Sequence, residues 1–236
     1  FRRVKFRNTR GTEPSAGLDI EPNFDVETVQ GIVLEDCAFS NNNGGGMIFP
    51  LGSAKPIDVT ARRCAFGAQN GRAPIEFLVR AGTYVKRQVR ADARFLFEDC
   101  TIEANDNQPG VSIQSAPLFD ISFRNVRFRT TGRTATWCTP RRKSPVEFLL
   151  NRDNGRNGIT PAMVGSCTFE NVTAFAGPFV RFVDEMGVQP VKGFFAGKAV
   201  YNGVETDVSQ FVYDAPDLDA PRLRHVPVTG VPSSRT

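Results

Sequence analysis

Residues 37–41 read Cys-Ala-Phe-Ser-Asn, and residues 64–66 read Cys-Ala-Phe again. The shared pattern is an apolar residue, a variable residue and a second apolar residue. It occurs six times, beginning at Val4, Cys37, Cys64, Cys100, Val126 and Cys167. The shortest step, from Cys100 to Val126, is 26 residues, and the longest, from Val126 to Cys167, is 41. A recurrence on this scale indicates stacked structural repeats.

A second pattern lies between the copies of the first. It is a short segment of alternating residues, as in a strand with one buried face. Its six copies are residues 18–21, 47–50, 75–78, 111–114, 146–149 and 180–183. Each repeat holds two or three short strands and has no room for a crossover helix. The sequence therefore predicts an all-β solenoid, a parallel β-helix whose coils stack about 4.8 Å apart.

The chain resembles right-handed parallel β-helix proteins of the pectate-lyase type. The stretch NTRGTEPSAGLDIEPN (residues 8–23), followed by DCAFSNNNGGG (36–46), is similar to a recurring segment of bacterial carbohydrate-degrading β-helix proteins. The resemblance covers roughly residues 1–185. It implies a single-stranded right-handed helix of about six to seven coils, and a secreted, cell-surface or periplasmic location. The same fold hosts lyases, hydrolases, epimerases and non-catalytic phage spikes, so the resemblance leaves the activity open.

The predicted domain boundaries follow from composition. Residues 1–213 are expected to form the β-helix, as the C-terminal portion of a larger protein. Residues 214–236 are expected to form an extended Pro-rich tail. We expect that the N-terminal cap of the helix is not part of this sequence. We expect an upstream segment or another subunit to cover the open end at Phe1 and Val4.

Cysteines and asparagines recur at fixed places in the repeats. Cys37, Cys64, Cys100 and Cys167 are expected to stack as buried thiols, since no CxxC spacing favours a metal site. Cys138 lies in a basic loop and is the cysteine expected to react. The resemblance also implies an asparagine ladder at the coil corners, where asparagine tolerates left-handed backbone. Its predicted members are Asn8, Asn41, Asn70, Asn105 and Asn171.

Carboxylates on the second pattern are the candidate catalytic groups. If Leu18 and Ile20 point inward, Asp19 and Glu21 point outward, about 7 Å apart along the strand. In-register stacking places Asp19, Ile48, Glu76, Ser112, Glu147 and Arg181 in one column. A glycosidase needs a pair of carboxylates, so we assign catalysis to Asp19, Glu21 and Glu76. Glu147 and Arg181 are assigned to substrate binding, although both, like Glu76, could instead form structural ion pairs.

Three long connections interrupt the repeat, at residues 79–94, 130–144 and 151–160. They are basic, and the second holds the single tryptophan. Insertions at one repeated position emerge on one side of a solenoid. They therefore predict either solvated loops or the wall of a cleft, with Arg80, Trp137 and Lys143 as substrate-binding residues. We also expect Gly44, Gly45 and Gly46 to leave room for a sugar ring beside the carboxylates.

The overall composition narrows the function classes. The 29 Lys and Arg residues against 25 Asp and Glu give a net charge of +4, too small to indicate nucleic acid. No run of eighteen apolar residues predicts a membrane span. The one histidine, His225, makes His-rich metal sites and a Ser-His-Asp triad improbable. The expected partner is a polysaccharide, neutral or anionic, and no cofactor is expected.

The leading prediction is a glycoside hydrolase, and two alternatives stay open. A lyase acting on a uronic-acid polymer would use Lys86, Arg87 or Lys143 as its base, with Ca²⁺ held by the carboxylates. A non-catalytic glycan-binding or structural β-helix would use the outward apolar residues as a docking stripe for a partner chain, although an upstream segment or the C-terminal strap could cover the stripe instead. That stripe comprises Ile48, Pro50, Leu78, Leu149 and Val183.

Overall fold

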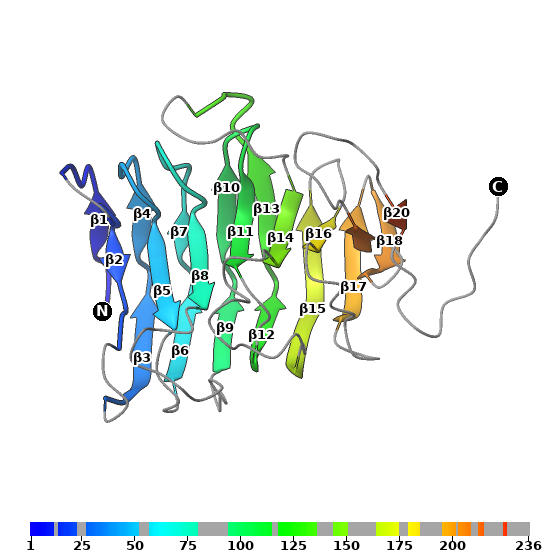
Figure 1. Cartoon of the computed structure of the whole chain (residues 1–236), viewed down its shortest axis with the longest axis horizontal. Coiled ribbons are helices and arrows are strands. Elements are labelled where there is room, and N and C mark those ends of the chain that lie inside the picture. Colours follow the sequence, from blue (N-terminus) through cyan, green and yellow to red (C-terminus); the bar gives the residue numbers. More distant parts are fainter. Residues whose placement is uncertain are drawn as a thin grey trace.

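The protein is a parallel β-helix, as the sequence predicts. The computed structural model describes residues 1–11, 14–22, 27–51, 57–79, 94–114, 118–135, 144–150, 164–174, 179–184, 195–201, 203–208, 212–214 and 224–225. The twenty elements in these ranges are all strands. Figure 1 shows them stacked along the long axis of the molecule, from the N-terminal strands in blue to the last strands in orange.

Each complete coil contributes three strands to two sheets. The second-pattern segments form a sheet of eight strands among the described residues, which we call the second sheet. Its members, in spatial order, are β2 (Leu18–Asp19), β5 (Met47–Leu51), β8 (Ile75–Val79), β11 (Pro109–Gln114), β14 (Ser144–Leu150), β16 (Val180–Asp184), β19 (Val212–Asp214) and β20 (Arg224–His225). All of these pairs are parallel except β19 with β20, which is antiparallel.

The first sheet has twelve described strands, in two rows that meet at a corner. Row 1 comprises β3 (Val29–Glu35), β6 (Ile57–Arg62), β9 (Arg94–Glu98) and β12 (Leu118–Arg124). Row 2 comprises β1 (Lys5–Arg7), β4 (Ala38–Ser40), β7 (Ala65–Phe66), β10 (Thr101–Ala104) and β13 (Arg127–Thr130). β15 (Val164–Ala174) runs through the corner and pairs with both β12 and β13. β17 (Phe195–Tyr201) follows β15 and forms a hairpin with β18 (Val204–Asp207).

Stacked phenylalanine rings fill the core. Phe6, Phe39 and Phe66 occupy successive strands of row 2, with ring centroids 4.7 and 4.9 Å apart. Phe49 and Phe77 stack in the same way in the second sheet, at 4.8 Å. These separations equal the spacing of neighbouring strands, so identical residues on successive coils stack face to face and hold the coils in register.

A single left-handed residue makes each corner between rows 1 and 2. Asp36, Arg63, Asp99, Asn125 and Asn171 all have φ between 49° and 55°. One residue in this region turns the chain sharply without a longer loop. Each corner residue directly precedes the first residue of a row 2 segment. The corner therefore marks where row 2 begins in each coil more reliably than the apolar pattern does.

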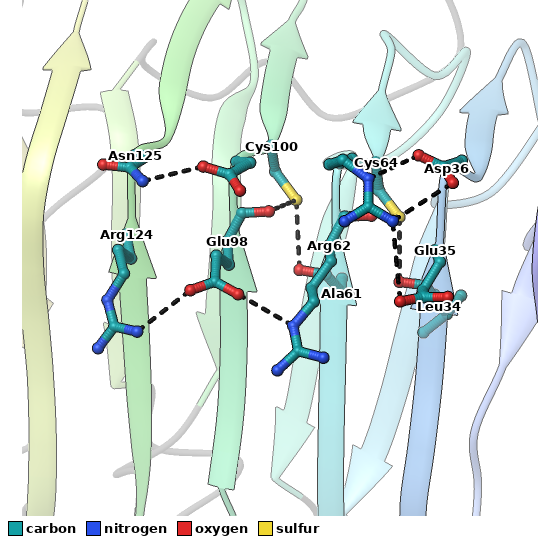
Figure 2. Close-up of polar contacts among 12 residues, drawn as sticks. Leu34, Glu35, Asp36, Ala61, Arg62, Cys64, Glu98, Cys100, Arg124 and Asn125 are labelled. Carbon is teal, nitrogen blue, oxygen red and sulfur yellow. Dashed lines mark hydrogen bonds and ion pairs between the residues drawn. The ribbon is translucent and has the colours of Figure 1, made fainter.

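Charges of opposite sign alternate beside this corner. Successive coils present Arg2, Glu35, Arg62, Glu98, Arg124 and Glu170. Figure 2 shows the centre of the series, where Glu98 accepts hydrogen bonds from Arg62 at 2.9 Å and Arg124 at 3.1 Å. Arg124 also donates to Glu170 at 2.8 Å. Because each charge contacts neighbours of opposite sign, the series stabilises one stacking register and disfavours a shift by one coil.

Reversing the central charge of this series is expected to destabilise the fold. A Glu98→Arg variant places three arginines side by side, whereas Glu98→Gln only removes the attraction. We expect the urea midpoint to fall for both variants, and further for Glu98→Arg. The difference should shrink as NaCl is raised, since salt screens exposed charges. Equal midpoints for the two variants at low salt would contradict a role for charge alternation.

Three of the predicted cysteines form a buried column. Cys37, Cys64 and Cys100 occupy the same position on successive coils and donate weak hydrogen bonds to backbone carbonyls. Cys167 is also buried, but the prediction that it belongs to this column is wrong. It lies opposite Ile121 in the row 1 half of β15. Val172, directly after the corner residue Asn171, holds the column position instead.

These thiols are expected to be chemically inert in the native protein. A hydrogen bond with Cys64 and burial raise the pKa of Cys100, and burial raises the pKa of Cys167. Both are therefore protonated and enclosed at neutral pH. The same hydrogen bond lowers the pKa of Cys64 to about 7, so the resistance of Cys64 to reagents depends on its burial. We expect all four buried cysteines to resist a thiol reagent until the protein is denatured. Cys138 lies outside the described residues and is expected to react first. Rapid native-state labelling of Cys64 or Cys100, read by peptide mass, would contradict this packing.

The asparagines are structural, as expected, but they do not form one ladder. Asn41 donates to Asn8 at 2.7 Å, and both have positive φ. Asn70 pairs with Asn43, and Asn171 pairs with Asn125 at the other corner. The buried Asn105 donates to the carbonyl of Gln69. The single predicted ladder is therefore wrong, because the polar turns of different coils differ in length and offset their side chains.

Two further features concern the ends and the surface. Within the predicted tail, residues 224–225 form β20, which pairs with β19 of the second sheet. Among the described tail residues, β20 is the only strand after β19. None of the described residues belongs to a helix that is long and apolar enough to cross a membrane.

Candidate functional site

The predicted column of the second sheet is present in the structure. Its register joins Asp19 to Ile48, Ile48 to Glu76 and Glu76 to Ser112. It continues from Ser112 to Glu147 and from Glu147 to Arg181. Met47 and Phe49, the neighbours of Ile48 in β5, belong to the hydrophobic core, whereas Ile48 does not. The column therefore lies on the face opposite the core.

Asp19 and Glu21 are the exposed carboxylates of this face. The intervening Ile20 is buried in the core, so both acidic side chains leave the sheet on the same side. They border a groove of about 350 Å³, whose described lining is Pro14, Asp19, Glu21, Ile48, Pro50, Arg72 and Leu78. Both also border a second hollow of about 460 Å³ between β2 and β3, with Phe1, Leu18, Val29 and Ile32. A ligand in either hollow would contact the two carboxylates.

Glu76 is placed differently from Asp19 and Glu21. Its side chain is 3% exposed, and its carboxylate accepts a hydrogen bond from Arg72 at 3.0 Å. Arg72 is itself 29% exposed and lines the groove. The contact thus links a buried carboxylate to a cation that faces the groove. Glu76 thus forms an ion pair with a nearby arginine, the structural alternative that the sequence left open for it.

Glu147 and Arg181 form a buried ion pair further along the column. Their side chains are 1% and 0% exposed, and the Arg181 Nη1 atom donates to the Glu147 carboxylate. The Nε and Nη2 atoms of Arg181 have no hydrogen-bond partner among the described residues. Ser112, between Glu76 and Glu147 in the register, is fully buried as well. These residues are reached from solvent only if the structure opens.

The apolar stripe of this face is buried where it is described. Ile48, Pro50 and Leu78 are all enclosed, and Ile48 and Leu78 lie outside the core cluster. The side chains of Leu149 and Val183 lie outside the described set. The prediction that this stripe is exposed to a partner chain is therefore wrong for Ile48, Pro50 and Leu78.

The expected role of the triple glycine is also wrong. Gly44, Gly45 and Gly46 are buried and do not border the groove. A Cβ atom on Gly44 would lie 1.8 Å from the carbonyl oxygen of Pro14, and one on Gly46 would lie 2.6 Å from that of Pro74. The glycines let the turns of successive coils stack against one another, which positions the Pro14 wall of the groove.

Three predicted binding residues, Arg80, Trp137 and Lys143, lie outside the described residues. The strands show where their connections attach. Residues 79–94 follow β8, and the two later connections precede and follow β14. The first and third connections follow the carboxyl ends of second-sheet strands, whereas the second joins β13 of the first sheet to the start of β14. The three therefore do not attach at one repeated position, and the prediction that they emerge together is wrong for the second. Among the described residues, no group of three or more His, Cys, Asp or Glu side chains is arranged to hold a metal ion.

Two groove residues were not predicted from the sequence. Arg72 and Pro14 lie in polar turns outside both repeat patterns, and nothing in their spacing marks them. A signal for Arg72 exists in retrospect, because it stands four residues before Glu76, at the start of the strand that carries the column. No family model, curated protein or solved structure matches the chain significantly.

Proposed function

We propose that the protein binds a polysaccharide in the groove beside β2 and β5 and hydrolyses it with Asp19 and Glu21. The observation that carries this proposal is a pair of exposed carboxylates at the wall of a groove, Asp19 on β2 and Glu21 two residues beyond the end of that strand. The resemblance to right-handed pectate-lyase-type proteins supports a carbohydrate ligand. A secreted, cell-surface or periplasmic location belongs to the same proposal.

The spacing of the two carboxylates suits hydrolysis with inversion. Residues two apart in an extended segment have Cα atoms about 7 Å apart. From that separation, side chains on one side of the chain can hold their carboxyl groups about 6.5–9.5 Å apart, as inverting glycosidases do. One group protonates the glycosidic oxygen, and the other activates a water molecule on the opposite face of the sugar. The groove between Pro14 and Leu78 is where the sugar would lie.

Glu76 takes a supporting part in this proposal. Because its carboxylate is buried and bonded to Arg72, it holds the guanidinium at the groove rather than meeting the sugar directly. Arg72 would bind hydroxyl or carboxylate groups of the substrate. Arg80, Trp137 and Lys143 are proposed to complete the wall. Glu147 and Arg181, both buried, would support the same face from within.

The identity of the reaction product tests the proposal. Purified protein is incubated with neutral polysaccharides and with uronic-acid polymers, and new reducing ends and unsaturated uronides are measured separately. If the protein is a hydrolase, we expect new reducing ends without unsaturated products. The Asp19→Asn variant should form no new reducing ends. Unsaturated uronides would instead show a lyase, and their loss with a calcium chelator would show a Ca²⁺ requirement. Binding without either product would show a non-catalytic glycan-binding protein.

A further inference from the structure

The outward face of row 2 carries four cations that form no ion pair with a described acidic side chain. In-register pairing places Lys5, Ala38, Ala65, Thr101 and Arg127 in one line across β1, β4, β7, β10 and β13. Arg7 and Arg129 stand two residues further along their strands. Lys5, Arg7, Arg127 and Arg129 are all exposed, and none forms an ion pair with another described residue.

Row 1 shows that this arrangement is not general for the solenoid. On its outer face Arg62, Glu98, Arg124 and Glu170 are joined in a continuous series of ion pairs. The charges there are neutralised within the protein. Row 2 has the same strand spacing and could have alternated charges in the same way. Its cations instead stand at the two ends, separated on the line itself by Ala38, Ala65 and Thr101, with Glu103 on β10 beside Arg129.

The dimensions of this surface suit an extended ligand. Four strand intervals separate Lys5 from Arg127, which is about 19 Å. The residues between them are Ala38, Ala65 and Thr101, so nothing large rises between the two cationic ends. The stacked rings of Phe6, Phe39 and Phe66 beneath hold the first three strands in fixed register. The line is therefore a flat, rigid path with cations at both ends.

We propose that this Lys5–Arg127 line binds an anionic polysaccharide, carboxylated or sulfated, as a surface separate from the groove of Asp19 and Glu21. Charge complementarity identifies the partner as a polyanion. Among polyanions, single-stranded nucleic acid needs aromatic side chains on which bases stack, and the line has none. A polysaccharide chain crossing the strands needs only the cations and an unobstructed floor. This binding does not depend on hydrolysis in the groove.

Glu103 gives the surface an internal control. It is the one acidic side chain between the cationic ends on β10, and it neighbours Arg129 in the register. Its charge opposes a bound polyanion. Removing that charge should strengthen binding, the opposite sign from removal of Lys5 or Arg127. A merely structural effect of substitution on this face would not reverse sign in this way.

The experiment measures affinity for polyanions at low and moderate salt. The probes are polygalacturonate, dextran sulfate, uncharged dextran and an oligodeoxythymidine, with wild type, Lys5→Gln/Arg127→Gln, Glu103→Gln and Lys198→Gln. Lys198 is exposed at the far end of the solenoid and is paired with Glu205, so it serves as the control for loss of a cation that is already neutralised. Each variant is first checked by thermal melting. Carboxylated and sulfated probes are compared to distinguish the two sources of negative charge.

The double variant is expected to bind at least one acidic polysaccharide about tenfold or more weakly than wild type, since it loses one cation at each end of the line. Glu103→Gln should bind it more tightly, and Lys198→Gln should match wild type. Because the measured quantity is affinity and not product release, a loss of binding in the double variant is read independently of hydrolysis in the groove. Unchanged affinity of the double variant, equal binding of uncharged dextran, or tighter binding of the oligonucleotide would overturn the proposal.

Discussion

An Asp19→Asn variant is expected to fold like the wild type and to lose glycan hydrolysis by at least about a hundredfold, the usual contribution of a positioned acid or base. Asp19 is exposed, and asparagine has the same shape, so the packing of β2 against β5 should survive. The variant removes only the negative charge and the capacity to transfer a proton. The measurements are initial rates of reducing-end release and thermal melting.

Companion variants sharpen this result. Glu21→Gln should lose activity on the same scale, because an acid-base pair fails when either member is removed. Glu205→Gln is the matched control, an exposed carboxylate on β18 at the far end of the solenoid. If both Asp19→Asn and Glu21→Gln kept near-native turnover, these carboxylates would not be the catalytic pair.

The repeat architecture could be predicted from sequence because the coils repeat side chains as well as length. Phe39 and Phe66 stand at equivalent places and stack at 4.9 Å, and the Asp19 column follows the predicted register through Arg181. Strand alternation has a period of two, so one correct inward residue fixes every outward one in that strand. This is why the face of the candidate site was predicted correctly.

The phase of the last repeat could not be read from apolar residues alone. Cys167-Thr168-Phe169 matches the first pattern in composition, yet it belongs to row 1. The left-handed corner is what fixes the phase, and Asn171 marks it. Aspartate, arginine and asparagine all occupy that corner, so no single residue type identifies it in the sequence. The error therefore reflects a corner defined by backbone conformation and not by side-chain chemistry.

Burial of the candidate column could not be predicted for a related reason. Outward residues of a sheet are expected to meet solvent, and Asp19 and Glu21 do. Glu76, Glu147 and Arg181 face the same way but are enclosed. Whether an outward face is covered depends on segments outside the two repeat patterns, which carry no periodic signal. The Arg72–Glu76 contact could not be predicted for the same reason, because Arg72 lies in a turn outside the repeat patterns.

The largest effect on stability is expected at the buried ion pair of β14 and β16. A Glu147→Gln variant leaves the Arg181 guanidinium fully enclosed without its carboxylate. Removing one partner of a buried pair costs about 3–5 kcal/mol. Arg181 already has two N–H groups without described partners, so little remains nearby to compensate for the loss. We expect the free energy of unfolding in urea to fall by this amount, with little dependence on salt.

The double variant Glu147→Leu/Arg181→Met decides what the pair contributes. It removes both charges while keeping approximate volume, and such replacements are often neutral or stabilising. We expect it to recover most of the stability that Glu147→Gln loses. If the stable double variant also binds and cleaves glycan like wild type, the pair only supports the sheet. If it folds but loses glycan binding, Glu147 and Arg181 act on substrate, and the column extends the groove of Asp19 and Glu21 along the solenoid.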